Sequence, residues 1–431
     1  MSPSHRPGAT ARPPFVVRPP QVTDLHGDSG TRGGGTRPAA GGAQEYRAAW
    51  PVRSPLDFPR VHPFNRFVWN FQAYAAARRA AFGVVNATLL LAALTLTSAC
   101  TTLTYVTQAA IGQDDLNRRA RDIDALVREK RVDARMRRLL SSVVSMKRFG
   151  EAHGLKATKN YVKYVHVNRP AVVWVASAAE PLAFKSKSWT FPLVGSFTYL
   201  GWFKLDEARA FAEGLRKEGL DVDVRGAGAY STAGFFEDAV LSTMVPPGRE
   251  AMGQLANTIL HESAHATIFV HGQSTLNESV ANFVGDKLGE RYVTETLGPD
   301  AQETVAYLAS ERRNERRGKA MRAAYKELQA LYGSGRSDAE KLAAKAAIVE
   351  RLRTDLAYRR PITNATLIQY KTYNSGQDEL AALLVTCGGD WPRFIQSLKR
   401  LETTKHPKAQ ESDIGKLVQP LVDAGCPTGP T

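Results

Sequence analysis

Cysteine is scarce in this chain of 431 residues, which holds only Cys100, Cys387 and Cys426. Their spacing matches neither a zinc ribbon nor a redox C-x-x-C motif, so the sequence excludes both kinds of site. Cys387 and Cys426 could form a disulfide in an oxidising compartment, provided that the fold brings their Cα atoms close enough.

Acidic residues are also few, with 42 Asp and Glu against 57 Lys and Arg, and the formal net charge is +15. Residues 1–99 contain no lysine, and their eleven arginines against four acidic residues leave about +7 of that charge there. A basic chain can bind nucleic acid or an anionic membrane surface. No nucleic-acid-binding motif accompanies the charge, and the other basic residues are mixed with acidic ones, as on solvated helical faces. We therefore predict no nucleic-acid partner.

The beginning of the chain lacks apolar periodicity. Residues 1–66 are rich in Pro, Gly and Arg, and such a segment cannot bury enough surface to offset the entropy cost of ordering it. We interpret residues 1–70 as a disordered or spurious N-terminal extension. Mass-spectrometric detection of peptides from residues 1–70 in the native protein would contradict a spurious or removed extension.

Residues 78–99 have the layout of a secretory signal. A basic pair, Arg78-Arg79, precedes an uncharged apolar run that ends in small residues directly before Cys100. This ending resembles a bacterial lipobox, in which the cysteine receives a lipid and becomes the new N-terminus. We predict a periplasm-facing protein anchored to the membrane through Cys100, and Thr101 rather than Asp after it favours the outer membrane. The alternative is a transmembrane helix of about 20 residues.

The remaining residues alternate between helical and strand patterns. Residues 101–170 have mostly helical periodicity, and residues 171–235 carry short β-branched and aromatic runs around an amphipathic helix at 205–218. The charged segment 300–358 predicts a helical hairpin with a break at its Gly-Ser-Gly sequence. Residues 362–402 predict two further helices.

We therefore predict an α+β fold that is mostly helical, with a small β-sheet block before the main motif. A hydrophobic content of 43% is enough for a sizeable core. The predicted catalytic domain consists of an N-terminal α+β part, residues 100–245, and a helical zinc-site part, residues 246–431.

One motif carries the chemistry: His261-Glu262-Ser263-Ala264-His265. On a helix, residues i and i+4 share one face, so His261 and His265 can bind one Zn²⁺. Glu262 beside them can take a proton from a water molecule that the metal activates. Zinc lowers the pKa of such a water to about 7 and polarises a carbonyl, which is what amide hydrolysis requires. His-Glu-x-x-His also occurs by chance in proteins that bind no metal, so the presence of a third ligand decides whether this motif is a metal site.

Two residues could supply the third ligand. His271 gives the metzincin spacing, but metzincins need Gly at the position of Ile268, where the chain must turn. Glu278 follows a predicted turn and would come from a second, antiparallel helix, which is the gluzincin solution. Thr275 and Glu278 could instead be a capping box that only starts this helix. We favour Glu278 as the ligand.

Several stretches of the chain match the pattern of one bacterial family. They are His261–Thr267, Asn277–Gly285, Cys100–Gln113, Ala229–Phe236, Leu241–Met244, Asn364–Leu367 and Cys387–Trp391. Together they resemble the bacterial putative aminopeptidase family, a family of predicted zinc peptidases with a lipoprotein signal. The likeness covers about residues 100–402. Departures at Asp114-Asp115 and Ala233 do not touch the metal motif.

The resemblance implies a zincin-like, gluzincin-type mechanism. His261, His265 and Glu278 would hold the zinc, and Glu262 would act as general base and then as acid. A transition-state oxyanion also needs a hydrogen-bond donor opposite the metal.

The candidate donors are tyrosines. We predict Tyr230 as this catalytic donor, on an edge strand beside the substrate, with Tyr370 and Tyr373 as alternatives.

The predicted function is therefore a zinc-dependent peptidase acting on a peptide substrate, and an aminopeptidase by its family resemblance. An aminopeptidase needs acidic groups that capture the substrate α-amine, and Glu237 and Asp238 are the only weak candidates. Endopeptidase action thus stays open. The alternative from another class is a non-catalytic, zinc-binding lipoprotein of the cell envelope.

Overall fold

A computed structural model gives the fold of the chain. It describes residues 104–191, 195–229, 237–373, 375–406, 408, 410–411 and 413–427. The predicted N-terminal extension, the signal sequence, Cys100 and Tyr230 lie outside these residues, so the predictions made for them stay predictions.

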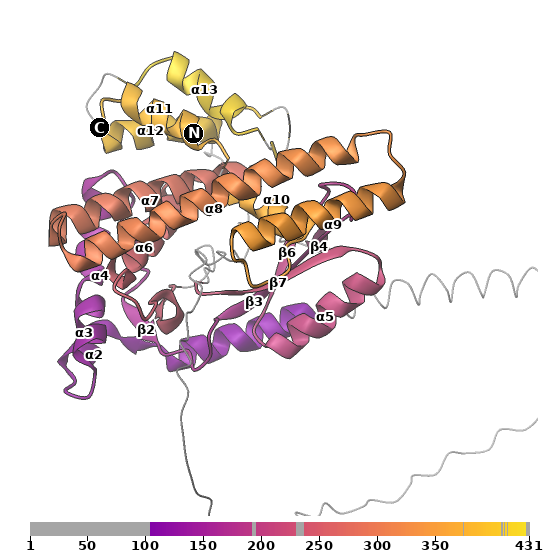
Figure 1. Cartoon of the computed structure of the whole chain (residues 1–431). Coiled ribbons are helices and arrows are strands. Elements are labelled where there is room, and N and C mark those ends of the chain that lie inside the picture. The colour runs from indigo at the N-terminus through magenta and orange to yellow at the C-terminus, as the bar shows by residue number, and fades with distance from the viewer. Residues whose placement is uncertain are drawn as a thin grey trace, which may run out of the picture. The chain divides into compact units, whose positions relative to one another are not determined.

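The described part of the chain is mostly helical, with short strands (Figure 1). The strands are β1 (Arg121–Asp122), β2 (Lys163–Val165), β3 (Val173–Ala179), β4 (Trp189–Phe191), β5 (Gly195–Phe197), β6 (Tyr199–Trp202), β7 (Asp221–Ala227) and β8 (Val240–Leu241). The helices are α2 (Ile123–Arg128), α3 (Ala134–Ser141), α4 (Val143–Ala152), α5 (Leu205–Lys217), α6 (Ala251–Thr267), α7 (Ser274–Leu297), α8 (Gln302–Tyr332), α9 (Asp338–Asp355), α10 (Asn364–Tyr373), α11 (Gln377–Thr386), α12 (Trp391–Thr403) and α13 (Gly415–Asp423). A short 3₁₀ helix, η1, spans Ser242–Met244, and residues 104–119 are also helical. These elements agree with the predicted class.

The main sheet has the strand order β6-β3-β7, with β3 antiparallel to both neighbours. Helix α5 covers one face of this sheet, where Val222 and Val224 pack against Ala212. Side chains alternate along a strand, so Asp223 and Arg225 of β7 lie on the opposite face. Helix α10 packs against that face. The remaining described strands form two smaller sheets, β1-β2-β8 and β4-β5.

Helix α6 lies at the centre of the helical part, against α4, α7 and α8 (Figure 1). It is buried almost all round, and the apolar residues Leu255, Ile259 and Leu260 are fully enclosed. A helix without a solvated face belongs to a core, so its polar side chains must find partners inside the protein. Those partners, described below, fix the orientation of the His-Glu-x-x-His motif.

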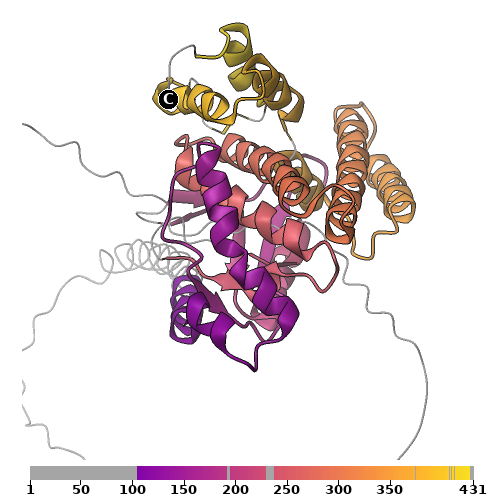
Figure 2. The same ribbon diagram turned by 90° about the vertical axis from the view of Figure 1, so that its left-hand side faces the viewer.

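The helical hairpin predicted over residues 300–358 is confirmed as α8 and α9, the orange pair in Figure 2. The prediction of two helices over residues 362–402 is wrong, because this segment contains α10, α11 and α12. The additional break lies at Gly376, whose φ of 68° is in the left-handed region. Glycine adopts this conformation without a steric penalty, which allows the chain to leave α10 and begin α11.

Cys387 and Cys426 form a disulfide in the structure, with their Cα atoms 5.0 Å apart. The pairing that the sequence left open is therefore confirmed. The bond joins the residue that follows α11 to the segment after α13. None of the helices in the described ranges is both long enough and apolar enough to cross a membrane.

Candidate metal centre

Three side chains of the described residues converge at one point, as the motif predicted: His261, His265 and Glu278. The two Nε2 atoms of the histidines are 3.2 Å apart. The Oε2 atom of Glu278 lies 3.7 Å from each of them. The point in their plane that is equidistant from the three atoms lies about 2.1 Å from each, which is the length of a Zn–N or Zn–O bond. The donor set therefore fits a zinc ion.

Burial supports the same interpretation. The His261 side chain is fully buried, and those of His265 and Glu278 are 15% and 10% exposed. The Glu278 Oε2 atom is buried and accepts no hydrogen bond from the described residues. A carboxylate in such a place is costly unless a cation or a donor satisfies it, and a metal held jointly with the two imidazoles would do so.

The ends of α6 and α7 place Glu278 opposite the histidines. Helix α6 ends at Thr267, and Ile268 is extended rather than turned, with φ −129°. The chain turns later, at Gly272, whose φ is 70°. The side chain of Asn277 then closes the turn, because it accepts a hydrogen bond from the Val270 N–H and donates one to the Val270 carbonyl, both at 2.9 Å. The second helix therefore returns antiparallel to the first.

The capping-box interpretation of Glu278 is wrong. Helix α7 begins at Ser274, and its N-terminal flanking residue, Gln273, forms no side-chain cap. Glu278 thus lies past the first turn, and its Oε2 atom is near the two histidines. Gln273 instead holds the turn to the C-terminal segment, donating to the Lys408 carbonyl and accepting from the Glu411 N–H.

Two glycines allow α7 to approach α6 closely. A Cβ atom on Gly285 would lie 2.9 Å from the Asn257 carbonyl oxygen and 3.0 Å from the His261 Cβ atom. A Cβ atom on Gly289 would lie 3.2 Å from the Asn257 Cα atom of α6 and 2.9 Å from the Tyr307 hydroxyl of α8. Contacts this short force neighbouring atoms to shift, so the absence of side chains here keeps the two ligand-bearing helices together.

A buried hydrogen-bond network fixes α6 one turn before His261. Asn257 is fully buried and donates to the Asp286 carboxylate at 2.7 Å and to the Tyr307 hydroxyl at 2.9 Å. It thereby ties α6 to α7 and α8. Sequence reasoning missed these residues, and the available signal was weak: an Asn four residues before the first histidine, on the same helical face.

His271 does not join the cluster of ligand atoms. It is exposed, follows the end of α6, and lies edge to face with Phe269 at 5.2 Å between ring centroids. His271 therefore has the sequence spacing of a metzincin ligand but does not lie at the candidate metal site.

Of the other predicted catalytic residues, Glu262 and Tyr370 lie in the described structure. Glu262 is buried on α6, directly after His261. Tyr230 and the side chain of Tyr373 lie outside the described structure. Tyr370 lines a cavity beside α7, and burial raises the pKa of its phenol, so its hydroxyl stays protonated and able to donate at neutral pH.

Comparison with known proteins gives one match. The model of the family described as "Putative aminopeptidase" matches residues 104–413, which include all three candidate ligands. The chain belongs to this family. The family supports a peptidase activity, and no curated protein and no solved structure matches the chain.

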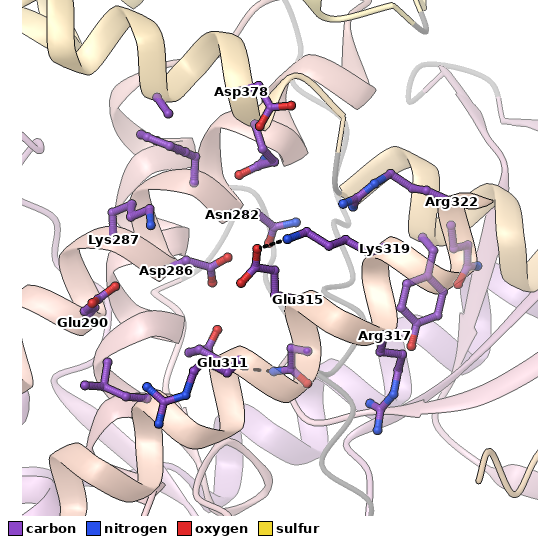
Figure 3. A pocket seen from close by; sticks show the side chains of 18 of the residues that line it. Asn282, Asp286, Lys287, Glu290, Glu311, Glu315, Arg317, Lys319, Arg322 and Asp378 are labelled. Carbon is purple, nitrogen blue, oxygen red and sulfur yellow. Dashed lines mark hydrogen bonds and ion pairs between the residues drawn. The ribbon is translucent and has the colours of Figure 1, made fainter. Parts of the chain in front are cut away.

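A charged cavity of about 580 Å³ lies between α7, α8, α10, α11 and β7 (Figure 3). The three candidate ligands do not line it, but Asn282 does, and Asn282 is one helical turn beyond Glu278. Residues at i and i+4 have Cβ atoms about 6 Å apart, so the cavity begins close to the candidate metal centre. Sequence analysis did not find this cavity, because its walls come from segments far apart in the chain.

Proposed function

We propose that this protein is a zinc-dependent peptidase of the gluzincin type, with a zincin-like catalytic domain. The observation that carries the proposal is the convergence of His261, His265 and Glu278 on one point at zinc–ligand distance. Membership of the putative aminopeptidase family supports the peptidase part of the proposal independently.

The chain's own residues would divide the chemistry between them. His261, His265 and Glu278 would hold the zinc, which when bound supplies a Lewis acid for the substrate carbonyl and lowers the pKa of water. Glu262 is the adjacent carboxylate on the same helix, and it would accept a proton from the attacking water and return it to the leaving amine. Tyr230 remains our proposed donor to the developing oxyanion.

We further propose aminopeptidase rather than endopeptidase action. The earlier candidates for binding the α-amine, Glu237 and Asp238, line a separate small cavity with Gln113 and Lys163. The large cavity beside Glu278 is a better place, because carboxylates of α7 and α8 line it: Asp286, Glu290, Glu311 and Glu315 (Figure 3). Lys287, Arg312 and Lys319 also line the cavity, and Lys319 pairs with Glu315. The ammonium group of a free peptide N-terminus would therefore pair with one of the other carboxylates.

A hydrolysis assay tests this proposal. Purified protein should cleave a peptide with a free α-amine at least tenfold faster than its N-acetylated form, measured by release of the N-terminal residue. Treatment with 1,10-phenanthroline should abolish cleavage, and equimolar Zn²⁺ should restore it. Equal cleavage of both peptides would contradict aminopeptidase action. No cleavage by protein with zinc bound would favour the non-catalytic envelope lipoprotein.

The membrane anchor is part of the proposal. We infer that a lipid on Cys100 holds the protein at the bacterial membrane, facing the periplasm, with the outer membrane favoured. A disulfide between Cys387 and Cys426 supports this location, because disulfides persist in oxidising compartments. Cys100→Ser should move the protein from the membrane fraction to the soluble fraction. Unchanged fractionation would contradict a lipid anchor on Cys100.

A further inference from the structure

The cavity beside the candidate metal centre is lined by arginines as well as by carboxylates. Arg225 of β7, Arg317 of α8 and Arg360 after α9 line it together with Tyr370 of α10. Figure 3 shows Arg317 well separated from Asp286 and Glu290, with its guanidinium on another side of the cavity. Basic side chains also lie among the carboxylates, since Lys287 follows Asp286 on α7 and Lys319 pairs with Glu315 at 2.7 Å. The lining is therefore of mixed charge.

Arg225 is an unusual member of this lining. The residue is only 6% exposed, yet its Nε and Nη1 atoms are buried and have no hydrogen-bond partner within the described residues. Its ion pair with Asp223 spans 3.6 Å, which is too long for a hydrogen bond. The pair with Asp223 Oδ2, which also lacks a hydrogen bond within the described residues, offsets only part of the cost of burying the guanidinium, so a further acceptor would be favoured.

The charges around Arg225 do not cancel. Asp223 also pairs with Arg360, whose Nη1 atom donates to Asp223 Oδ1 at 3.1 Å. The single carboxylate of Asp223 therefore pairs with the guanidinium groups of both Arg225 and Arg360, so these three side chains carry a net charge of about +1. Arg317 lines the same cavity. An anion bound here would balance the group.

We propose that Arg225, with Arg360 and Arg317, binds a carboxylate of the peptide substrate, an inference that rests on the proposed peptidase function for the identity of the ligand. The planar guanidinium fork matches a carboxylate with two parallel hydrogen bonds. The volume of the cavity suits a short peptide.

Carboxylates elsewhere in the lining, such as Glu290, can pair with a positive charge, which a peptide with free ends carries and a phosphate does not. The protein would thus prefer short peptides with a free carboxylate at the end away from the metal.

Binding measurements test this without turnover. The probe is Ala-Ala-Ala, titrated by isothermal calorimetry into full-length protein carrying Glu262→Gln, beside its C-terminal amide. The free acid should bind about tenfold to hundredfold more tightly than the amide, as expected for a lost charge-assisted pair. Arg225→Met in the same background should bring the two affinities together. Equal binding of acid and amide to the parent protein would overturn the inference.

A matched pair of variants keeps the test valid if Arg225→Met fails to fold. Arg360→Gln should weaken binding of the free acid several-fold. Arg359→Gln changes the neighbouring arginine, which is exposed and outside the cavity lining, and should leave binding unchanged. Equal effects of the two changes would contradict the subsite.

Inorganic phosphate serves as the competing anion. Failure of millimolar phosphate to displace Ala-Ala-Ala supports a carboxylate site. Displacement that depends on Arg225 would show a phosphate site and overturn the commitment to a carboxylate. None of these binding experiments depends on peptide hydrolysis. If the wild type hydrolyses no peptide but the protein still binds the free acid more tightly than the amide, the proposed peptidase function is wrong and the carboxylate subsite stands.

Discussion

Replacing Glu262 with Gln should lower the rate of peptide hydrolysis at least about a thousandfold while the zinc content stays at that of the wild type. Glutamine keeps the size of the side chain but cannot accept a proton, and general acid–base groups typically contribute factors of about 10² to 10⁴. A thousandfold loss corresponds to about 4 kcal/mol of transition-state stabilisation. Glu262 is not one of the three clustered ligands, so zinc binding should survive. The rate and the metal content are both measured on the purified variant.

The control is Glu295→Gln, the same substitution in an exposed carboxylate near the end of α7, where Glu295 pairs with Arg291. It should leave both the rate and the zinc content unchanged. A Glu262→Gln protein that retains more than a tenth of the wild-type rate would contradict the assigned role. Loss of zinc from it would instead mean that Glu262 helps to hold the metal.

Removing the disulfide should lower the free energy of unfolding by about 4 kcal/mol, as the chain-entropy relation gives for a link between residues 39 positions apart. The change is the double substitution Cys387→Ala and Cys426→Ala, and urea denaturation measures it. The bond restricts the unfolded chain, and it also ties the end of α11 to the segment after α13.

Dithiothreitol provides the control. It should destabilise the wild type by a similar amount and should have no effect on the double variant. A wild type with the same denaturation midpoint in both redox states would show that the bond contributes nothing to stability.

The convergence of His261, His265 and Glu278 could be predicted from the sequence because it depends on local geometry. The spacing of His261 and His265 sets their common face on any helix, and a following turn with a second helix offers Glu278. The choice against His271 rested on Ile268, which is indeed extended and makes no tight turn. Helix periodicity and one turn were therefore sufficient.

The surroundings of the centre could not be predicted in this way. The hydrogen bonds of Asn257 to Asp286 and Tyr307 join three helices, and no periodicity within one helix indicates its partners. The charged cavity similarly combines Arg225 of a strand with Arg360, which lies 135 positions away. Such features depend on how distant elements pack.

In the fold, too, elements with a strong local pattern could be predicted and elements that depend on distant partners could not. The amphipathic helix predicted at 205–218 is observed as α5 (Leu205–Lys217), because a long periodic pattern with a following glycine is a strong local signal. The two-residue strands β1 and β8 were not predicted, since each is too short for its alternation to be recognised. They form only because β2 lies between them.

The central claim is that one zinc ion is held by His261, His265 and Glu278, and metal analysis tests it most directly. Inductively coupled plasma mass spectrometry of purified wild type, Glu278→Ala and His271→Ala would give zinc per chain. We expect about one zinc ion in the wild type and in His271→Ala, and a large loss in Glu278→Ala, because a structural or catalytic zinc site rarely survives on two protein ligands. Full zinc in Glu278→Ala together with its loss in His271→Ala would contradict the account.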